Sequence, residues 1–393
     1  MSRGDGTSAT LASIAVGAVV AALVTAFTGT AVVPSRALPA PASPAAARPT
    51  SSSPAPTSTT SVVADACAGP IAGLTPRARL AQLVMVGVDP RGSLDALRVV
   101  RGEQVGGIFI GGDDVGLLSG NALAAVHEAS TLPLTVAVDD EGGRVQRVDE
   151  LDGDLPSARA LAARLSPDEV RDTARKRGAA LRARGVTMDL APVVDTSDQP
   201  DRTVIGDRSF SADPAVTVDY ARAFAAGLRD AGVDAVLKHF PGHGNTTGDS
   251  HLGEVRSPAL DALRAKDLVP YRSLPSFGAV SVMVGHIDVP GLTDGQPASL
   301  SPAAYALLRD EFGFDGPAMT DDLGAMRAVT DRVDLPDAVT RALASGADVA
   351  LWSSGGRVGE VLDRLERATG SGELPATRVD QALRRVLRAK HVC

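Results

Sequence analysis

Short apolar runs separated by helix-like stretches constrain the fold of this chain most strongly. The stretches between the runs, for example 157–184, 213–231, 258–274 and 302–313, show helical periodicity and are rich in Ala, Leu and Arg. Near-continuous apolar runs are typical of parallel strands that are covered on both faces. Such runs occur at 80–88, 106–112, 132–140, 186–195, 233–240, 279–287, 316–322 and 347–354.

Alternating strand and helix units predict an α/β fold, a single (β/α)8 TIM-type barrel over residues 67–393. A doubly wound open sheet is the alternative, but no dinucleotide-binding fingerprint follows the first run. In a barrel, the carboxyl ends of the strands surround one mouth, and polar residues gathered there predict an active site. The polar residues at these ends are Asp139, Glu141, Asp195, Lys238, His239, His286, Asp321 and Asp322.

The first 66 residues differ in composition from the rest of the chain. Residues 11–33 form an uncharged, mostly apolar run that is long enough, as a helix, to cross a bilayer core of about 30 Å. We therefore expect residues 1–33 to be a signal peptide or an N-terminal membrane anchor. The protein would then be exported, either secreted or held on the outer face of the cytoplasmic membrane. Residues 34–66, rich in Pro, Ala, Ser and Thr, predict a disordered linker.

The chain has two cysteines, Cys67 and Cys393, one at each end of the predicted barrel. In an exported protein such a pair predicts a disulfide. Closing so long a loop would stabilise the fold by about 4 kcal/mol. The alternative is a reduced pair whose side chains do not meet.

Three of the six histidines lie in the segment KHFPGHGNTTGDSH, residues 238–251. A zinc site made of His239, His243, His251 and Asp249 is one reading. The Pro-Gly step between the first two histidines keeps them off a common helical face, and we expect neither metal nor cofactor. Asp249, two residues before His251, can instead fix the tautomer of that imidazole, as a general acid or base requires.

The same segment resembles the signature of the glycoside hydrolase family 3 β-N-acetylhexosaminidases, bacterial β-N-acetylglucosaminidases of peptidoglycan turnover. That signature reads K-H-F-P-G-H-G, four variable residues and D-S/T-H. Three further motifs follow the family's order. They are DDEGGRVQR at 139–147, similar to D-x-E-G-G-R-V-Q-R; GDRSF at 206–210, similar to G-x-R-S-F; and TDDL at 320–323, similar to S/T-D-D/A-L/M. The resemblance spans about residues 74 to 390.

The resemblance implies residue roles and a retaining double displacement. It implies that Asp321 is the nucleophile, that His251 is the acid and base, and that Asp249 orients His251. The implied reaction removes terminal β-linked N-acetylglucosamine from cell-wall fragments. The implied sugar-contacting residues are Asp139, Arg147, Arg208, Lys238 and His239.

Several alternatives remain open at this point. About 70 residues follow Asp321, which leaves no room for the second domain of family 3 β-glucosidases and favours the hexosaminidase type. A family 3 β-glucosidase and an N-acetylglucosaminide phosphorylase are nevertheless alternatives. A catalytically silent wall-sugar-binding protein is another, although it would not need Asp321, Asp249 and His251 together.

The expected partner is a small sugar substrate, an N-acetylglucosamine-containing muropeptide or a chitooligosaccharide, bound by a monomer. The formal net charge of −8 argues against a nucleic acid as partner. The single tryptophan, Trp352, lies at the end of the last predicted strand and could either stack on a sugar or belong to the core.

Overall fold

The computed structural model describes residues 65–393. The predictions for residues 1–33 and for nearly all of the linker at 34–66 lie outside this described part. Within it, none of the helices is both long and apolar enough to span a membrane.

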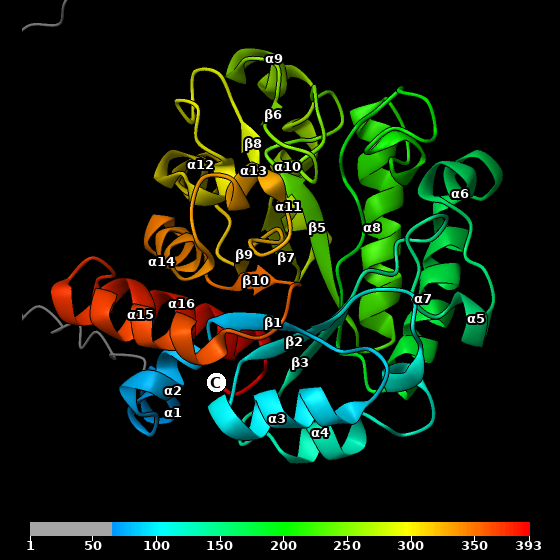
Figure 1. The fold of residues 1–393 in the computed structure, drawn as a ribbon. Helices are drawn as coiled ribbons and strands as arrows, with labels where there is room; N and C mark the ends of the chain where they lie inside the picture. Colours follow the sequence, from blue (N-terminus) through cyan, green and yellow to red (C-terminus); the bar gives the residue numbers. More distant parts are fainter. Residues whose placement is uncertain (1–64) are drawn as a thin grey trace, which may run out of the picture. The chain divides into compact units, whose positions relative to one another are not determined.

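The eight predicted strands form one parallel sheet in the order β10-β1-β2-β3-β4-β5-β7-β9 (Figure 1). Its two end strands meet, because Thr320 N donates to Val349 O (3.0 Å) and Leu323 N donates to Leu351 O (2.9 Å). The predicted (β/α)8 barrel is therefore confirmed. The strands are β1 (Val84–Val88), β2 (Gly107–Ile110), β3 (Thr135–Val138), β4 (Met188–Asp189), β5 (Asp234–Phe240), β7 (Ser281–Val284), β9 (Ala318–Thr320) and β10 (Ala350–Trp352).

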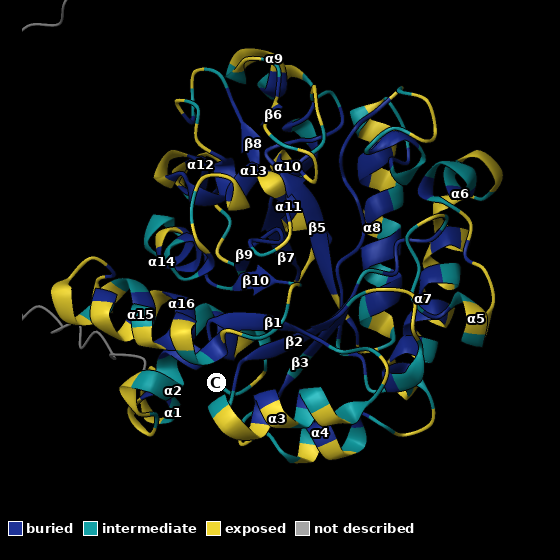
Figure 2. Cartoon of the chain, viewed as in Figure 1, coloured by how far each residue is buried: buried dark blue, intermediate teal, exposed yellow. Residues whose placement is uncertain are grey.

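Helices surround the strands (Figure 1), and their buried faces turn inward (Figure 2). In α8 the buried positions Val218, Ala221, Ala225 and Leu228 recur every three or four residues, the spacing of one helical face. The helices are α1 (Ala68–Ala72), α2 (Pro76–Ala81), α3 (Ser93–Glu103), α4 (Ala124–Glu128), α5 (Asp149–Asp152), α6 (Ala158–Arg164), α7 (Pro167–Ala183), α8 (Pro214–Asp230), α9 (Leu260–Ala265), α10 (Val269–Arg272), α11 (Leu274–Phe277), α12 (Pro302–Ala306), α13 (Arg327–Thr330), α14 (Leu335–Ser345), α15 (Val358–Ser371) and α16 (Ala376–Ala389).

The helical stretch predicted at 157–184 is two helices. Ser166 caps α7: its side chain accepts from Glu169 N, the Glu169 carboxylate accepts from Ser166 N, and Pro167 occupies the first turn. Such a capping box with proline starts a new helix, so α6 ends before it. The stretch at 302–313 likewise divides, into α12 and a π-helical turn at Leu307–Glu311.

The core has two layers. Side chains such as Met85, Phe109 and Met283 fill the barrel interior, whereas Val84 and Val86 belong to the cluster shared with the helices. This alternation is the period-two geometry of a strand. Figure 2 shows buried strands inside helices whose outer faces are exposed.

A second, two-stranded parallel sheet pairs β6 (Val255–Arg256) with β8 (Ile287–Asp288). It follows the loop after β5 and the end of β7. The sheet ties the histidine-rich loop to the barrel, since Val255 pairs with Ile287.

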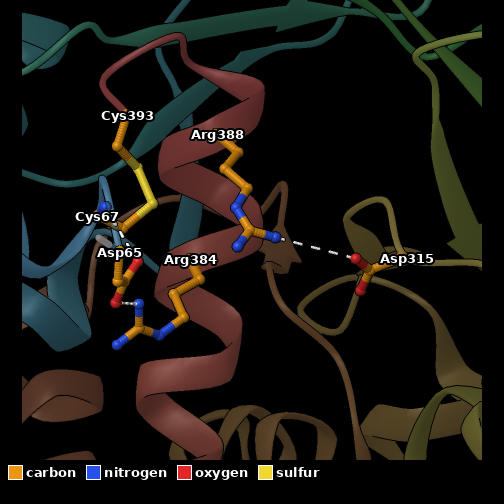
Figure 3. The surroundings of a disulfide bond; sticks show 6 residues. All are labelled: Asp65, Cys67, Asp315, Arg384, Arg388 and Cys393. Carbon is orange, nitrogen blue, oxygen red and sulfur yellow. Dashed lines mark hydrogen bonds and ion pairs between the residues drawn. A yellow bond between two sulfur atoms is a disulfide. The ribbon is translucent and has the colours of Figure 1, made fainter. Parts of the chain in front are cut away.

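The two ends of the described chain are joined by a disulfide between Cys67 and Cys393, with an S–S distance of 2.03 Å (Figure 3). Beside it, Asp65 forms an ion pair with Arg384 of α16. Lys390 Nζ donates to Gly106 O (2.6 Å), just before β2. The disulfide therefore lies toward the amino ends of the strands.

Candidate active site

A cavity of about 550 Å³ opens at the carboxyl ends of the barrel strands. Of the predicted functional residues, all but Asp249 line it. Asp249 lines an adjoining cavity of about 480 Å³, which shares Arg208 and His251 with the first. The predicted residues that line the larger cavity are Asp139, Arg147, Arg208, Lys238, His239, His251 and Asp321.

Glu141 connects the cationic groups at the bottom of this cavity. Its carboxylate accepts from Arg208 Nε and Nη2, each at 2.7 Å, and lies 2.6 Å from Lys238 Nζ. Lys238 also donates to Asp139 Oδ1 at 2.6 Å. Burial would raise the pKa of Glu141, but Arg208 and Lys238 outweigh it and hold this pKa far below its usual range. Glu141 is thus a buried anion that holds two cations at the cavity.

Asp195, at the end of the fourth predicted strand, plays a similar part for two histidines. Its Oδ2 lies 2.7 Å from His239 Nδ1, and its Oδ1 accepts from His243 N at 2.6 Å. The carboxylate can only accept, so Nδ1 of His239 carries the proton and Nε2 faces the cavity side. Burial, together with the charge of nearby His239, lowers the pKa of His243 to about 4. His243 is therefore neutral near pH 7.

Asp321 follows β9 and is held from both sides. Its backbone N donates to Val284 O (3.0 Å), and its Oδ1 accepts from Asp322 N (2.9 Å). Burial raises the pKa of Asp321, but His239, His286, the Asp322 amide and Lys238 more than offset this, so the pKa lies below its ordinary value. The carboxylate is ionised, with Oδ2 free toward the cavity, as a nucleophile requires.

Asp322 supports the rim between β9 and β10. Its carboxylate accepts from Ser353 N (2.9 Å) and Gly324 N (2.8 Å), and from the Ser353 hydroxyl. His286 in turn contacts the Asp322 carbonyl at 2.8 Å. Both strand-end residues noted in the sequence therefore serve to fix the segment that carries Asp321.

His251 and Asp249 form a dyad on the loop after β5. His251 Nδ1 lies 2.9 Å from Asp249 Oδ1, which also accepts from His251 N at 3.0 Å. Burial raises the pKa of Asp249, but the two bonds from His251 outweigh it and keep the carboxyl ionised. Since Asp249 orients Nδ1, Nε2 is left to exchange a proton. The imidazole is 63% exposed.

Two arginines hold the loop that leads to Arg208. Arg159, on α6, donates to the carbonyls of Ser197 (3.0 Å) and Gly206 (2.7 Å), and Arg144 donates to that of Val204 (3.0 Å). Gly206 has φ +48°, and a Cβ there would lie 2.3 Å from Asp201 O. Only glycine fits this position, which explains the first residue of the GDRSF motif.

Asp140 shapes the turn before Arg147. Its Oδ2 accepts from Arg147 N (2.8 Å) and Val148 N (3.2 Å), so the side chain points away from the cavity. The Arg147 guanidinium donates to Gln146 O at 2.6 Å and lines the cavity. The stacking role considered for Trp352 is wrong: its side chain is fully buried, and its Nε1 donates to Gly356 O at 3.2 Å.

Within residues 65–393, no three His, Cys, Asp or Glu side chains lie close enough together to hold a metal ion. His239 and His243 face each other edge to face at 5.7 Å between ring centroids, while His251 pairs with Asp249. The histidines are thus divided between two carboxylates.

A parallel barrel with an ionised aspartate, a carboxylate-oriented histidine and several charged hydrogen-bonding groups at its mouth defines an enzyme of the (β/α)8 glycosidase class. The chain belongs to glycosyl hydrolase family 3, because the model of that family's N-terminal domain matches residues 75–389. The resemblance predicted from the four motifs is confirmed.

Named relatives are similar over most of the chain. The β-hexosaminidase LpqI of Mycobacterium tuberculosis is 52% identical over 338 residues, covering 84% of this chain and 87% of the relative. The crystal structure of a family 3 glycosyl hydrolase from Mycobacterium smegmatis has a TM-score of 0.78 at 52% identity, covering 81% of this chain and 98% of that one. The β-N-acetylhexosaminidase of Beutenbergia cavernae has a TM-score of 0.73 at 30% identity, covering 81% and 99%.

Proposed function

We propose that this protein is a retaining β-N-acetylhexosaminidase that removes terminal β-linked N-acetylglucosamine. The observation that carries the proposal is that Asp321 and His251 line one cavity, together with the cations held by Glu141. Membership of family 3, with relatives named β-hexosaminidase, supports the same activity.

In the first step, Asp321 Oδ2 attacks the anomeric carbon and the glycosidic bond breaks. The bonding pair leaves with the glycosidic oxygen, which takes a proton from Nε2 of His251. A covalent glycosyl-enzyme and a free aglycone alcohol result. Asp249 stabilises the imidazolium before transfer, and its hydrogen bond keeps the ring facing the aglycone side.

In the second step, His251 Nε2 takes a proton from water as the water oxygen attacks the anomeric carbon. The bond to Asp321 breaks, and the carboxylate regains its charge. Two displacements give net retention of configuration. Phosphate in place of water would give a sugar phosphate, so phosphorolysis is the second candidate reaction at the same groups.

The sugar would be held by five residues that the structure gathers around the cavity. Charge-assisted hydrogen bonds from such groups fix a neutral sugar by direction rather than by net charge. Lys238 and Arg208 are already aligned by Glu141, so little reorganisation is needed on binding. The proposed contacts are Asp139, Arg147, Arg208, Lys238 and His239.

We propose further that the enzyme acts outside the cytoplasmic membrane, as a monomer, on cell-wall fragments such as muropeptides. The apolar run at 11–33 supports export. A disulfide between Cys67 and Cys393 also suits an oxidising compartment.

The test compares initial rates of the purified protein on an aryl β-N-acetylglucosaminide and on the matching aryl β-glucoside, with and without added phosphate. A strong preference for the N-acetyl substrate, with free N-acetylglucosamine as product, is the expected result. Preference for the glucoside would make it a β-glucosidase, and a sugar 1-phosphate product would make it a phosphorylase. An inactive protein that still binds the sugar would be a binding module.

A further inference from the structure

The loop that carries the Asp249–His251 dyad has a single buried residue, Ser250. All the remaining residues from Thr247 to Glu254 are at least partly exposed. The side chain of His251 is 63% exposed and Leu252 is 72% exposed. Ser250 itself is 3% exposed. A lone buried hydroxyl in an exposed segment needs a partner.

Ser250 finds its partners on the segment that follows the proposed nucleophile. Its hydroxyl donates to Met326 Sδ at 3.4 Å, and its carbonyl accepts from Ala328 N at 3.1 Å. Met326 lies five residues after Asp321, is 9% exposed and lines the same cavity. The contact thus joins the histidine loop to the segment that bears Asp321.

The other contacts of this loop do little to fix the position of His251 relative to Asp321. Its base is closed by Thr247 and Arg256, which exchange backbone bonds at 2.9 and 3.1 Å. Above that base, Gly248 and Gly253 have φ of +97° and +157°, a conformational freedom that other residues lack. The ion pair between Glu254 and Arg332 is solvent-exposed and contributes little.

We propose that Ser250 is a positioning residue. Its hydrogen bond to Met326 fixes the position of His251 relative to Asp321, so that His251 reaches the glycosidic oxygen. This inference rests on the proposed function. A thioether is a weak acceptor, so the contact can also be released when the aglycone leaves. The predicted defect is therefore confined to proton donation and spares the attack by Asp321.

Leaving groups of different acidity separate these two events. A phenyl leaving group needs the proton from His251, whereas a dinitrophenyl group departs as a stable anion. For Ser250→Ala we expect kcat/KM, which reports the first step, to fall about fivefold with the phenyl substrate, the effect of one buried hydrogen bond. With the dinitrophenyl substrate it should change less than about twofold. Equal losses on both substrates, or none, would overturn the proposal.

Two variants sharpen the assignment. Ser250→Thr keeps the hydroxyl and should restore the phenyl rate to within about twofold of wild type. Met326→Leu removes the acceptor at nearly constant volume. Combined with Ser250→Ala it should add nothing to the phenyl-specific defect, because both changes break the same bond. Additive defects would contradict a shared bond. Glu254→Gln is the matched control on the same loop and should leave both substrates at wild-type rates.

Hydrogen exchange of the full-length protein tests the contact without relying on activity. The Ala328 amide and the loop peptide spanning 247–256 should exchange faster in Ser250→Ala than in wild type or Ser250→Thr. Unchanged exchange would refute the contact even if the enzyme is active. If the wild type hydrolyses no substrate, the proposed function fails, whereas the exchange result still decides whether the contact orders this loop.

Discussion

The Glu141 carboxylate accepts hydrogen bonds from both Nε and Nη2 of Arg208, each at 2.7 Å, inside the mouth of the barrel. The same carboxylate lies 2.6 Å from Lys238 Nζ. One buried anion therefore holds two of the five residues proposed to bind the sugar.

Replacing Glu141 with Gln should weaken sugar binding and stability together. The amide is neutral, so buried Arg208 loses its counterion and Lys238 keeps only its ion pair with Asp139. We expect the free energy of unfolding to fall by about 3 kcal/mol and kcat/KM to fall about a hundredfold. Chemical unfolding and aryl-substrate kinetics measure the two losses. Glu254→Gln, in an exposed pair, is the control, and a Glu141→Gln variant as active as this control would contradict the role.

Asp321→Asn removes the proposed nucleophile while keeping the shape of the side chain. Hydrolysis of an aryl β-N-acetylglucosaminide should fall by roughly a thousandfold or more. Binding of N-acetylglucosamine, followed by calorimetry, should persist because the five proposed sugar contacts are untouched. Asp294→Asn, an exposed loop aspartate in the left-handed region, is the matched control. Substantial residual activity in Asp321→Asn would move the nucleophile elsewhere.

The free energy of unfolding should fall as the solution is acidified through the pH range in which His243 is neutral in the folded state but protonated in the unfolded state. Burial and nearby His239 place the folded pKa of His243 at about 4, whereas an unfolded histidine takes up a proton near pH 6.5. The unfolded state therefore binds more protons between these values, and the loss reaches about 3 kcal/mol by pH 4. Urea unfolding across pH 4 to 7 measures it. His243→Gln should weaken the dependence of the unfolding free energy on pH, whereas His391→Asn, at an exposed histidine, should leave it unchanged. The same pH dependence in both variants would contradict this prediction.

Loss of the disulfide should destabilise the barrel without touching the chemistry. Cys67 and Cys393 are 326 positions apart, so the bond restricts the unfolded chain strongly. The free energy of unfolding of the Cys67→Ser, Cys393→Ser double variant should be about 4 kcal/mol lower than that of wild type. Its kcat/KM at a temperature where both proteins are folded should match wild type, because the disulfide lies away from the carboxyl ends of the strands. An unchanged melting temperature would show that the bond does not constrain the chain.

Much of the fold follows from local patterns. The eight apolar runs appear as the eight barrel strands because parallel strands covered on both faces need apolar residues throughout. The sequence also contains the signal that separates α6 from α7, namely Ser166, Pro167 and Glu169. Helical periodicity continues across this signal, so the stretch was predicted as one helix. The pairing of β6 with β8 could not be anticipated, since each has two residues and their contact depends on the closed barrel.

The site was predicted as a set of strand ends, without its internal contacts. Sequence alone places Asp139, Lys238 and Asp321 at one mouth, and the cavity contains them. It gives no means of telling that Glu141 contacts both Arg208 and Lys238 while Asp139 contacts Lys238, because Asp139 and Glu141 follow the same strand. His243 was considered only as a metal ligand. Its bond to Asp195 joins residues 48 positions apart and emerges only in three dimensions.

The most direct test of the central claim is to trap the glycosyl-enzyme. An activated 5-fluoro N-acetylglucosaminyl fluoride should react with the protein faster than water releases the product, and peptide mass spectrometry can locate the bound sugar. The account predicts one adduct, on the Asp321 carboxylate, and none in Asp321→Asn. An adduct on another residue, or an active enzyme that forms none, would contradict a double displacement at Asp321.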